Sequence, residues 1–191
     1  MIEIDATSFN ANGQFITEKF PVLTHGTSPN IDMQSWRLQI FGEVEREIEF
    51  TWNQIIRLPK VRVTADFHCV THWSRLKNTW EGISCQEILR LSSPLPFARY
   101  VMVHCYGGYR TNLELSELEQ PTSLFAINHD GKQLELGHGA PLRLILPRRY
   151  GWKNAKWVKG LEFMTKNYPG FWEQRGYHIR GDARNGERFR T

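Results

Sequence analysis

The chain has 191 residues, 40% of them hydrophobic, a composition that supports one substantial buried core. Lys and Arg number 24 against 20 Asp and Glu, and the formal net charge of +4 is mild for a nucleic-acid binder and favours a small anionic partner. Apolar runs fall far short of the roughly 18 consecutive residues of a membrane helix. We expect one domain over residues 1–191, with residues 1–15 at its periphery.

The cysteines and the N-terminus indicate a compartment. Cys69, Cys85 and Cys105 are odd in number and far apart, which argues against a disulfide framework and against a Cys-x-x-Cys site. Residues 1–12 are polar and acidic, without an apolar signal region or a twin-arginine motif. The sequence therefore predicts a cytoplasmic protein.

The first half of the chain has the alternating pattern of strands, predicted over residues 36–42, 47–50 and 61–67. Thr51 is placed to cap a short helix over residues 52–58, which Pro59 ends. The third of these strands is rich in β-branched residues and leads directly to Cys69. We therefore expect this thiol at the end of a strand.

Two Ser-x-x-Glu pairs in the second half, Ser84 with Glu87 and Ser116 with Glu119, predict capped helices. Further strands are predicted over residues 100–106, 123–128, 132–136, 141–147 and 157–165, with a loop over residues 107–112. Strands outnumber the short helices and no βαβ alternation occurs, so we expect a mixed α+β fold dominated by antiparallel sheet. The tail from Gly170 is predicted to wrap around the domain.

Cys69 is the first candidate for chemistry. His68, His72 and Arg75 lie near it in sequence, a setting that favours the thiolate, which is the form that ligates a metal or attacks a substrate. The alternative is a buried structural cysteine, because free cysteine is among the most buried residue types. We interpret Cys85 and Cys105 in that second way.

A second candidate is a basic segment in the last third of the chain. Its members are His138, Arg143, Arg148, Arg149, Lys153 and Lys156, and no acidic residue interrupts them. Guanidinium and ammonium groups at this density predict an anion site, with phosphate well suited to the planar fork of arginine. The alternative is a turn with solvated charges.

Several short motifs together resemble one known family. They are His68-Cys69-Val70-Thr71 with Trp73-Ser74, Trp80-x-Gly82, Thr111-Asn112-Leu113, His138-Gly139-x-Pro141-Leu142-Arg143, Trp152-Lys153-x-x-Lys156-Trp157, Gly170-Phe171-Trp172-Glu173 and Gly176-Tyr177-His178. In order and spacing they resemble the molybdopterin-binding domain of the sulfite oxidase family. Closest in character are the compact prokaryotic members, described as sulfite-oxidase-like oxidoreductases.

The resemblance implies a molybdenum-molybdopterin cofactor with Cys69 as the metal ligand, a role that suits a soft thiolate. The cofactor contacts that it implies are His25, Thr111, Asn112, His138, Arg143, Lys153, Asn154, Ala155 and Lys156. Side chains that would bind an anionic substrate or tune the metal centre from nearby are His72, Arg75 and Arg110.

The activity implied by the resemblance is two-electron oxygen-atom transfer on a small substrate. No Cys-x-x-Cys-His haem site is present, so electrons would be exchanged with a separate electron-transfer protein. Sulfite oxidases of the family carry arginine five residues after the metal-binding cysteine, whereas this chain has Ser74, as the methionine-sulfoxide-reductase branch does. Sulfite is therefore not the expected substrate.

Two other functions are compatible with the residues themselves. Cys69 with His68 or His72 has the composition of a metal-independent thiol enzyme. A basic loop together with seven tryptophans is compatible with a non-enzymatic domain that binds anions or nucleic acid. The thiol enzyme leaves the basic segment unexplained, and the tryptophans lie mostly at positions typical of a core.

Overall fold

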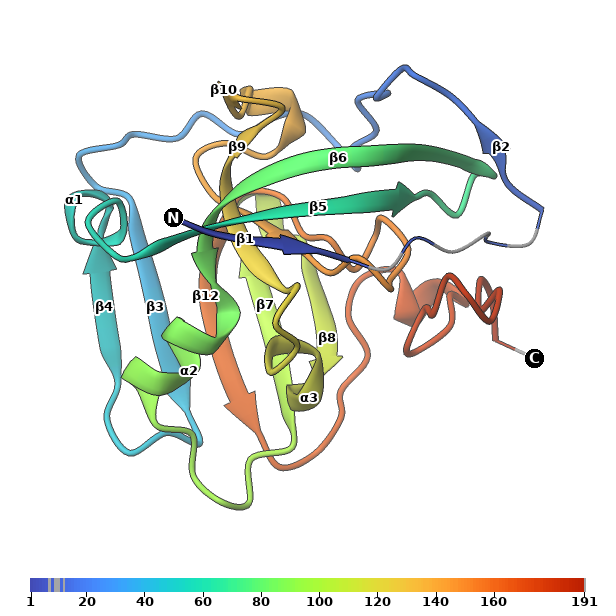
Figure 1. The fold of residues 1–191 in the computed structure, drawn as a ribbon. Coiled ribbons are helices and arrows are strands. Elements are labelled where there is room, and N and C mark those ends of the chain that lie inside the picture. The colour runs from blue at the N-terminus through green and yellow to red at the C-terminus, as the bar shows by residue number, and fades with distance from the viewer. Residues whose placement is uncertain (7, 9–10, 12, 191) are drawn as a thin grey trace.

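Two β-sheets make up most of the computed structural model, which describes residues 1–6, 8, 11 and 13–190 (Figure 1). One sheet contains β1 (Ile2–Asp5), β2 (Phe15–Ile16), β5 (Lys60–His68), β6 (Trp73–Ser84), β9 (Leu124–His129), β10 (Lys132–Gln133) and β11 (Arg143–Ile145). The other contains β3 (Arg37–Gly42), β4 (Ile48–Thr51), β7 (Tyr100–Cys105), β8 (Arg110–Glu114) and β12 (Val158–Met164). Thr7, Phe9, Asn10 and Asn12, part of the segment predicted to be peripheral, lie outside the described residues.

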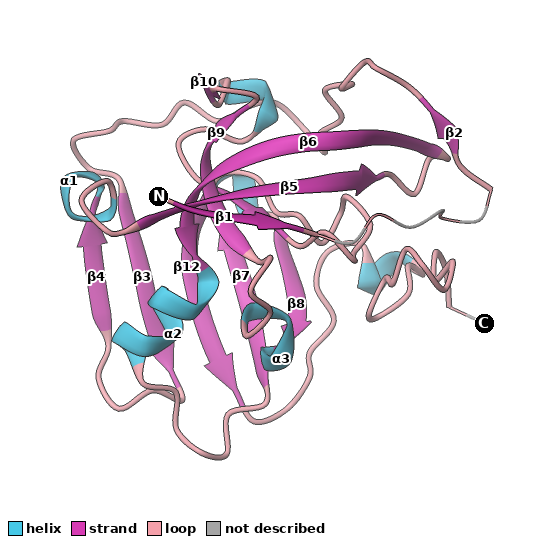
Figure 2. Cartoon of the chain, viewed as in Figure 1, coloured by secondary structure: helices cyan, strands magenta, loops and turns pink. Residues whose placement is uncertain are grey.

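The helices are short and lie beside the sheets (Figure 2). They are α1 (Trp52–Ile55), α2 (Cys85–Ser92) and α3 (Leu115–Leu118), with single 3-10 turns at Tyr106–Gly108, Leu136–His138 and Glu173–Arg175. Most strand pairs are antiparallel, so the predicted mixed α+β fold dominated by antiparallel sheet is confirmed. No helix in the described part of the chain is both long and apolar enough to cross a membrane.

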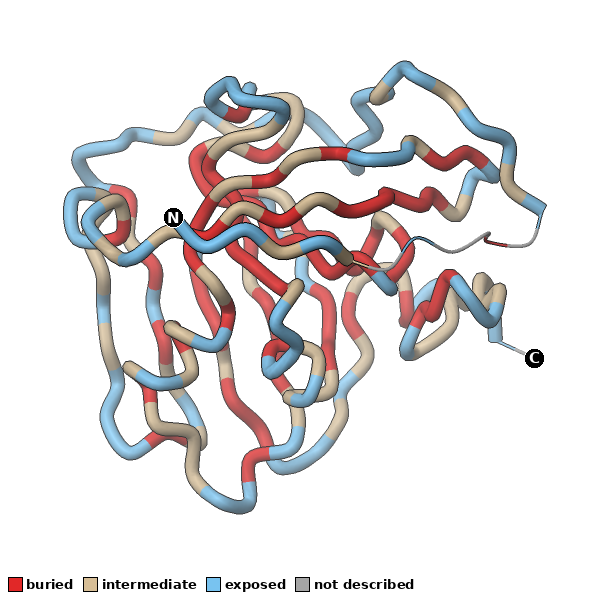
Figure 3. Tube along the Cα trace, viewed as in Figure 1, coloured by how far each residue is buried: buried red, intermediate tan, exposed pale blue. Residues whose placement is uncertain are grey.

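The core lies between the sheets, where the inward faces of the central strands are buried (Figure 3). Leu38, Ile40 and Leu161 of the five-stranded sheet belong to one buried cluster with Ile83 and Phe125 of the other sheet. Side chains that alternate between buried and partly exposed along β5 and β6 reflect the two faces of a strand. The long β5–β6 hairpin extends beyond this core (Figure 1), and its turn carries Cys69, the residue predicted to bind a metal.

Cap chemistry was predicted correctly for two helices and wrongly for the third. Thr51 accepts a hydrogen bond from the Gln54 backbone, and Ser84 accepts one from the Glu87 backbone. The first helix is shorter than predicted, however, and ends at Ile55. Ser116 is not a cap: it lies inside α3, whose N-cap is Glu114, because β8 carries the chain directly into the helix.

Other differences concern strands. Residues 110–112 belong to β8 and not to the predicted loop, because they pair with β7. Three strand pairs are parallel, namely β1 with β5, β2 with β6 and β3 with β12. Such partners come from distant parts of the sequence, so no hairpin turn indicates them.

The C-terminal tail packs on the body through a buried carboxylate, as its aromatic and charged composition predicted. Glu173 is fully buried, and its Oε1 lies 2.6 Å from Lys153 Nζ. The same oxygen accepts hydrogen bonds from Thr111 (2.9 Å) and Trp152 (3.0 Å). Gly170 allows this approach, since a Cβ there would lie 2.5 Å from the Arg110 carbonyl oxygen.

Removing this carboxylate is expected to destabilise the protein strongly. Glu173→Ala leaves the Lys153 ammonium buried without its counter-charge, which costs about 3–5 kcal/mol of unfolding free energy. Urea unfolding followed by tryptophan fluorescence measures this loss. Glu87→Ala is the control, because its partner Arg90 is exposed at the surface and the pair contributes little. Equal losses in the two variants would contradict the role given to Glu173.

Candidate functional site

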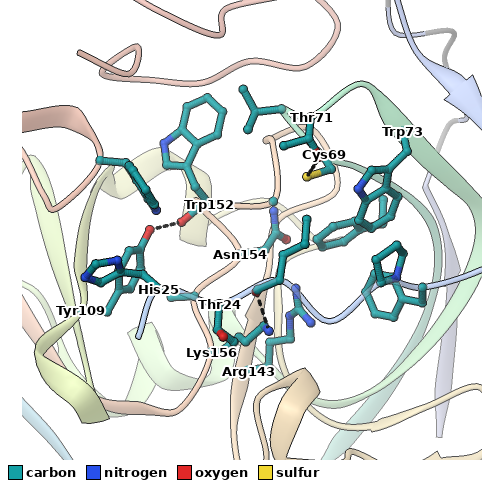
Figure 4. Close-up of a pocket in the computed structure, with 18 of the residues that line it drawn as sticks. Thr24, His25, Cys69, Thr71, Trp73, Tyr109, Arg143, Trp152, Asn154 and Lys156 are labelled. Carbon is teal, nitrogen blue, oxygen red and sulfur yellow. Dashed lines mark hydrogen bonds between the residues drawn. The ribbon is translucent and has the colours of Figure 1, made fainter. Parts of the chain in front are cut away.

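A large pocket opens between the Cys69 end of the β5–β6 hairpin and the loop that follows β11. Its cavity volume is about 200 Å³. The residues that line it are Phe20, Pro21, Leu23, Thr24, His25, Phe67, Cys69, Val70, Thr71, Trp73, Tyr109, Arg143, Gly151, Trp152, Asn154, Ala155, Lys156, Trp157, Trp172 and Tyr177. In Figure 4, Cys69 and Thr71 lie at the upper end and Arg143 and Lys156 at the lower end.

Cys69 lies in the tight turn of the hairpin, immediately after β5. Its backbone N–H donates to the Trp73 carbonyl (2.8 Å), and its own carbonyl accepts from the His72 N–H (3.2 Å). The Sγ atom contacts the Thr71 hydroxyl at 3.1 Å. The turn thus directs the thiol into the pocket, with only 8% of the residue exposed.

Cys85 and Cys105 are buried, as their interpretation as structural cysteines predicted. Both belong to the main core cluster, with at most 1% of each residue exposed. Burial raises the pKa of both thiols well above the ordinary value. Neither lines the pocket. Among the cysteines, therefore, only Cys69 is placed to react with a ligand in the pocket.

The cationic end of the pocket depends on a glycine. Gly139 adopts a φ of +116°, and a Cβ at this position would lie 3.2 Å from Arg143 Cβ and 3.1 Å from Lys156 Cβ. Its small size lets β11 and the following loop bring both cations to one place. Arg143 Nη1 donates to the His138 carbonyl (2.8 Å), and Lys156 Nζ donates to the Gly137 (2.6 Å) and Leu23 (2.8 Å) carbonyls.

These two cations have no carboxylate partner among the described residues. Burial lowers the pKa of Arg143 to about 9 despite an opposing contribution from the charge of Cys69. Burial and the nearby Arg143 lower the pKa of Lys156 to about 7. The buried Arg143 Nε also lacks a hydrogen-bond acceptor within the part of the chain described. An anion at this end would supply the missing acceptor and the missing charge.

Two other members of the basic segment, Arg149 and Lys153, are neutralised by carboxylates from elsewhere in the chain. Arg149 pairs with Glu117 of α3 and with Asp182 of the tail at 3.1 Å. Lys153 pairs with Glu173. The prediction that the whole segment requires an anion is therefore wrong, because distant carboxylates balance part of it.

The structure brings together six of the predicted site residues and leaves the others outside the pocket lining. Those that line it are His25, Cys69, Arg143, Asn154, Ala155 and Lys156. Those that do not are His72, Arg75, Arg110, Thr111, Asn112, His138 and Lys153. Asn154 has a scaffold role as well, since its Oδ1 accepts from the Leu146 N–H (2.6 Å) and its Nδ2 donates to the Arg149 (3.0 Å) and Tyr150 (3.1 Å) carbonyls.

Each residue outside the lining has a definite environment. His72 contacts the Gly13 carbonyl at 2.9 Å. Arg75 pairs with Asp130 at 2.6 Å, and Arg110 is exposed. Thr111, Asn112 and Lys153 form the buried network around Glu173, and His138 stacks on Phe20 with ring centroids 4.8 Å apart. The network residues lie behind the pocket wall and support the loop and the tail.

Other pocket residues were not identified as site residues from the sequence. Thr71 follows the cysteine by two positions in the hairpin turn, which is the signal that would have indicated it. Trp152 and Tyr177 contact each other edge to face, with centroids 5.0 Å apart. Burial and the charge of Cys69 raise the pKa of Tyr177, which lines the pocket with this thiol. Trp152 and Tyr177 are aromatic, which is typical of core residues, so the sequence did not indicate that they line a pocket.

The depressed pKa values predict how stability depends on pH. Lys156, Lys153 and Arg143 titrate near 7, 8 and 9 in the folded protein, below their ordinary values. The unfolded chain therefore binds more protons above pH 7, and the stability of the protein without ligands rises from pH 7 to 9. Thermal unfolding across this range measures the rise.

Lys156→Met is expected to flatten this rise, because it removes the group that loses its proton first. Lys166→Met, at an exposed position, is the matched control and should leave the slope unchanged. A wild-type stability that falls steadily over the same range would contradict the sign of these shifts.

Comparison with known proteins supplies the family. Residues 25–172 match the family described as "Oxidoreductase molybdopterin binding domain". The chain is 41% identical to the uncharacterized oxidoreductase YuiH of Bacillus subtilis over 177 residues, which cover 92% of this chain and 89% of that protein. It is 32% identical to the putative protein-methionine-sulfoxide reductase subunit YedZ1 of Azospira oryzae, with 80% of this chain and 58% of the relative covered.

Two further proteins are similar. The protein-methionine-sulfoxide reductase catalytic subunit MsrP of Campylobacter jejuni is 25% identical, and the match covers 88% of this chain and 61% of that protein. The crystal structure of the sulfane dehydrogenase SoxCD from Paracoccus pantotrophus shares the fold, with a TM-score of 0.70, 19% identity and coverage of 80% of this chain and 43% of that chain. The resemblance found in the sequence is confirmed: the chain belongs to the sulfite-oxidase-like family of molybdopterin-binding oxidoreductases.

Proposed function

We propose that this oxidoreductase binds molybdenum-molybdopterin in the pocket and uses it to transfer an oxygen atom to or from a small substrate. The observation that carries the proposal is that one pocket contains both the Cys69 thiol and two cations without carboxylate partners, Arg143 and Lys156. The chemistry that such a cofactor supplies when bound is two-electron oxygen-atom transfer.

The donor set of the pocket fits this cofactor. No group of three or more His, Cys, Asp or Glu side chains capable of holding a metal ion occurs in the described ranges. A metal held by the single soft thiolate of Cys69 would therefore take its remaining ligands from the cofactor itself. The cationic end suits a phosphate, and the Arg143 Nε without an acceptor supports an anion there.

The chain's own residues would then divide the work. Cys69 ligates the metal, and the Thr71 hydroxyl holds its Sγ atom in place. Arg143 and Lys156 bind the anionic end of the cofactor. His25, Asn154 and Ala155 contact it along the pocket, while aromatic side chains such as Phe67, Trp73 and Trp152 exclude water. His72 and Arg75 act from outside the lining, by supporting the β5–β6 hairpin.

The substrate and the partner belong to the same proposal. Two relatives are named as parts of methionine-sulfoxide reductases, so sulfoxides are the first substrates to test. Both of these relatives are described as subunits, which supports a separate electron-transfer protein as the partner of this chain. We place the reaction in the cytoplasm, because all three cysteines are free thiols.

The metal-independent thiol enzyme is less well supported. His68 Nδ1 contacts the Ser74 hydroxyl at 2.7 Å, and His72 Nδ1 contacts the Gly13 carbonyl at 2.9 Å. The Cys69 thiol contacts the Thr71 hydroxyl, which is not a base. This geometry does not favour a Cys-His pair.

Elemental analysis of the purified protein, with fluorescence of the released and oxidised pterin, tests the cofactor. About one molybdenum and one pterin per chain are expected from a host that makes the cofactor. A protein that contains neither, although its host loads other molybdenum enzymes, would refute the proposal.

Cys69→Ser is expected to abolish oxygen-atom transfer to or from a sulfoxide or other small substrate, while pterin is retained. Turnover is lost because the serine hydroxyl is a hard, weakly acidic ligand for the metal. Pterin is retained because Arg143 and Lys156 still bind the anionic end of the cofactor. Turnover with an artificial electron donor or acceptor and the pterin content are measured together. Cys85→Ala, in the core, should lose stability but keep both metal and turnover. Catalysis that persists in metal-free protein and requires Cys69 would instead favour the thiol enzyme.

A further inference from the structure

The N-terminal arm, residues 13–17, crosses the hairpin turn that carries Cys69. Strand β2 pairs in parallel with β6, so that Phe15 lies opposite Trp73 and Ile16 opposite Ser74. The Phe15 N–H donates to the His72 carbonyl (2.9 Å), and the Thr17 N–H donates to the Ser74 carbonyl (2.9 Å). The arm is thus hydrogen-bonded to His72 and to the start of β6, close to the thiol.

One side chain of this arm reaches Cys69 itself. Gln14 Nε2 donates a hydrogen bond of 2.9 Å to the Cys69 carbonyl, across 55 residues of sequence. The bonds that otherwise fix the Cys69 backbone come from within the turn, from Trp73 and His72. Gln14 therefore restrains the Cys69 backbone from a separate segment of the chain, and this backbone carries the thiol.

The turn requires outside support because it contains an unfavourable conformation. His72 has a φ of +70°, in the left-handed region that residues other than glycine rarely adopt. Such conformations persist where the surrounding structure fixes them. The arm provides this support twice at His72, through the Phe15 N–H and through the Gly13 carbonyl.

The arm also lies outside the family domain, since the matched residues begin at position 25. We propose that Gln14 is a positioning residue, which fixes the Cys69 carbonyl and thereby the direction of the thiol in the pocket. The consequence for a bound metal rests on the proposed function. The placement of the thiol does not, and it is measurable in protein that contains no metal.

The first test measures the alkylation rate of Cys69 by iodoacetamide in metal-free protein, with mass spectrometry to separate it from the buried Cys85 and Cys105. Gln14→Met preserves the length of the side chain without the donor, and Gln14→Leu removes the donor with a shorter uncharged side chain. Each is expected to raise the rate by about three- to tenfold, the change that corresponds to one lost hydrogen bond.

Phe15→Ala is the matched control. It alters an exposed side chain of the same arm, retains the backbone bond to His72 and should leave the rate unchanged. A wild-type rate in Gln14→Met or Gln14→Leu would overturn the proposal, as would an equal acceleration in Phe15→Ala. Thermal unfolding identifies a misfolded variant, and two different Gln14 variants keep the test decisive if one of them does not fold.

The second test reads the metal centre through the sulfur-to-molybdenum charge-transfer absorption of loaded protein. The band is expected to shift in Gln14→Met and to be unchanged in Phe15→Ala. A variant that had only lost folding stability would not show a shifted band. An unshifted band in Gln14→Met would contradict the positioning role at the metal. Wild-type protein that lacks molybdenum, although its host loads other molybdenum enzymes, would refute the proposed function, whereas the alkylation rates would still decide the role of Gln14.

Discussion

The buried ion pair between Lys153 and Glu173 holds the pocket together. It joins the loop after β11 to the C-terminal tail at 2.6 Å, with both side chains at most 1% exposed. Trp152, which lines the pocket, donates to the same carboxylate. Since breaking a buried pair leaves an uncompensated charge, tail and loop keep one relative position. The pocket wall is therefore as rigid as this pair, although its residues come from distant parts of the sequence.

The positive side chains of one short segment have two different roles. Arg149 and Lys153 are balanced by carboxylates of α3 and the tail, and both are structural. Arg143 is buried and Lys156 is partly buried, and neither has such a partner among the described residues; the cost is reflected in their lowered pKa values. A fold retains two desolvated cations side by side at a penalty, and an anionic ligand is what offsets that penalty in the loaded protein.

Local patterns predicted much of the fold and the centre of the pocket. Features that depend on neighbouring residues could be predicted from the sequence. They are the alternation that leads to Cys69, the caps at Thr51 and Ser84, and most of the hairpins. The parallel pairs and the neutralisation of Lys153 depend on segments far apart in the chain, which no local pattern indicates. Tyr177 was missed as a pocket residue because buried aromatic side chains look alike in a core and in a pocket wall.

The fold keeps the position five residues after the cysteine out of the pocket lining. Ser74 is buried, and its hydroxyl contacts His68, so it does not line the pocket. The side chains that share the pocket with the thiol include Thr71 and Tyr177, one a small hydroxyl and the other an aromatic phenol. Among the described residues that line the pocket, the arginine and lysine side chains are Arg143 and Lys156, and both lie at the end opposite the thiol (Figure 4). The described side chains beside the thiol are therefore uncharged, and the positive charge of the pocket lies at its far end.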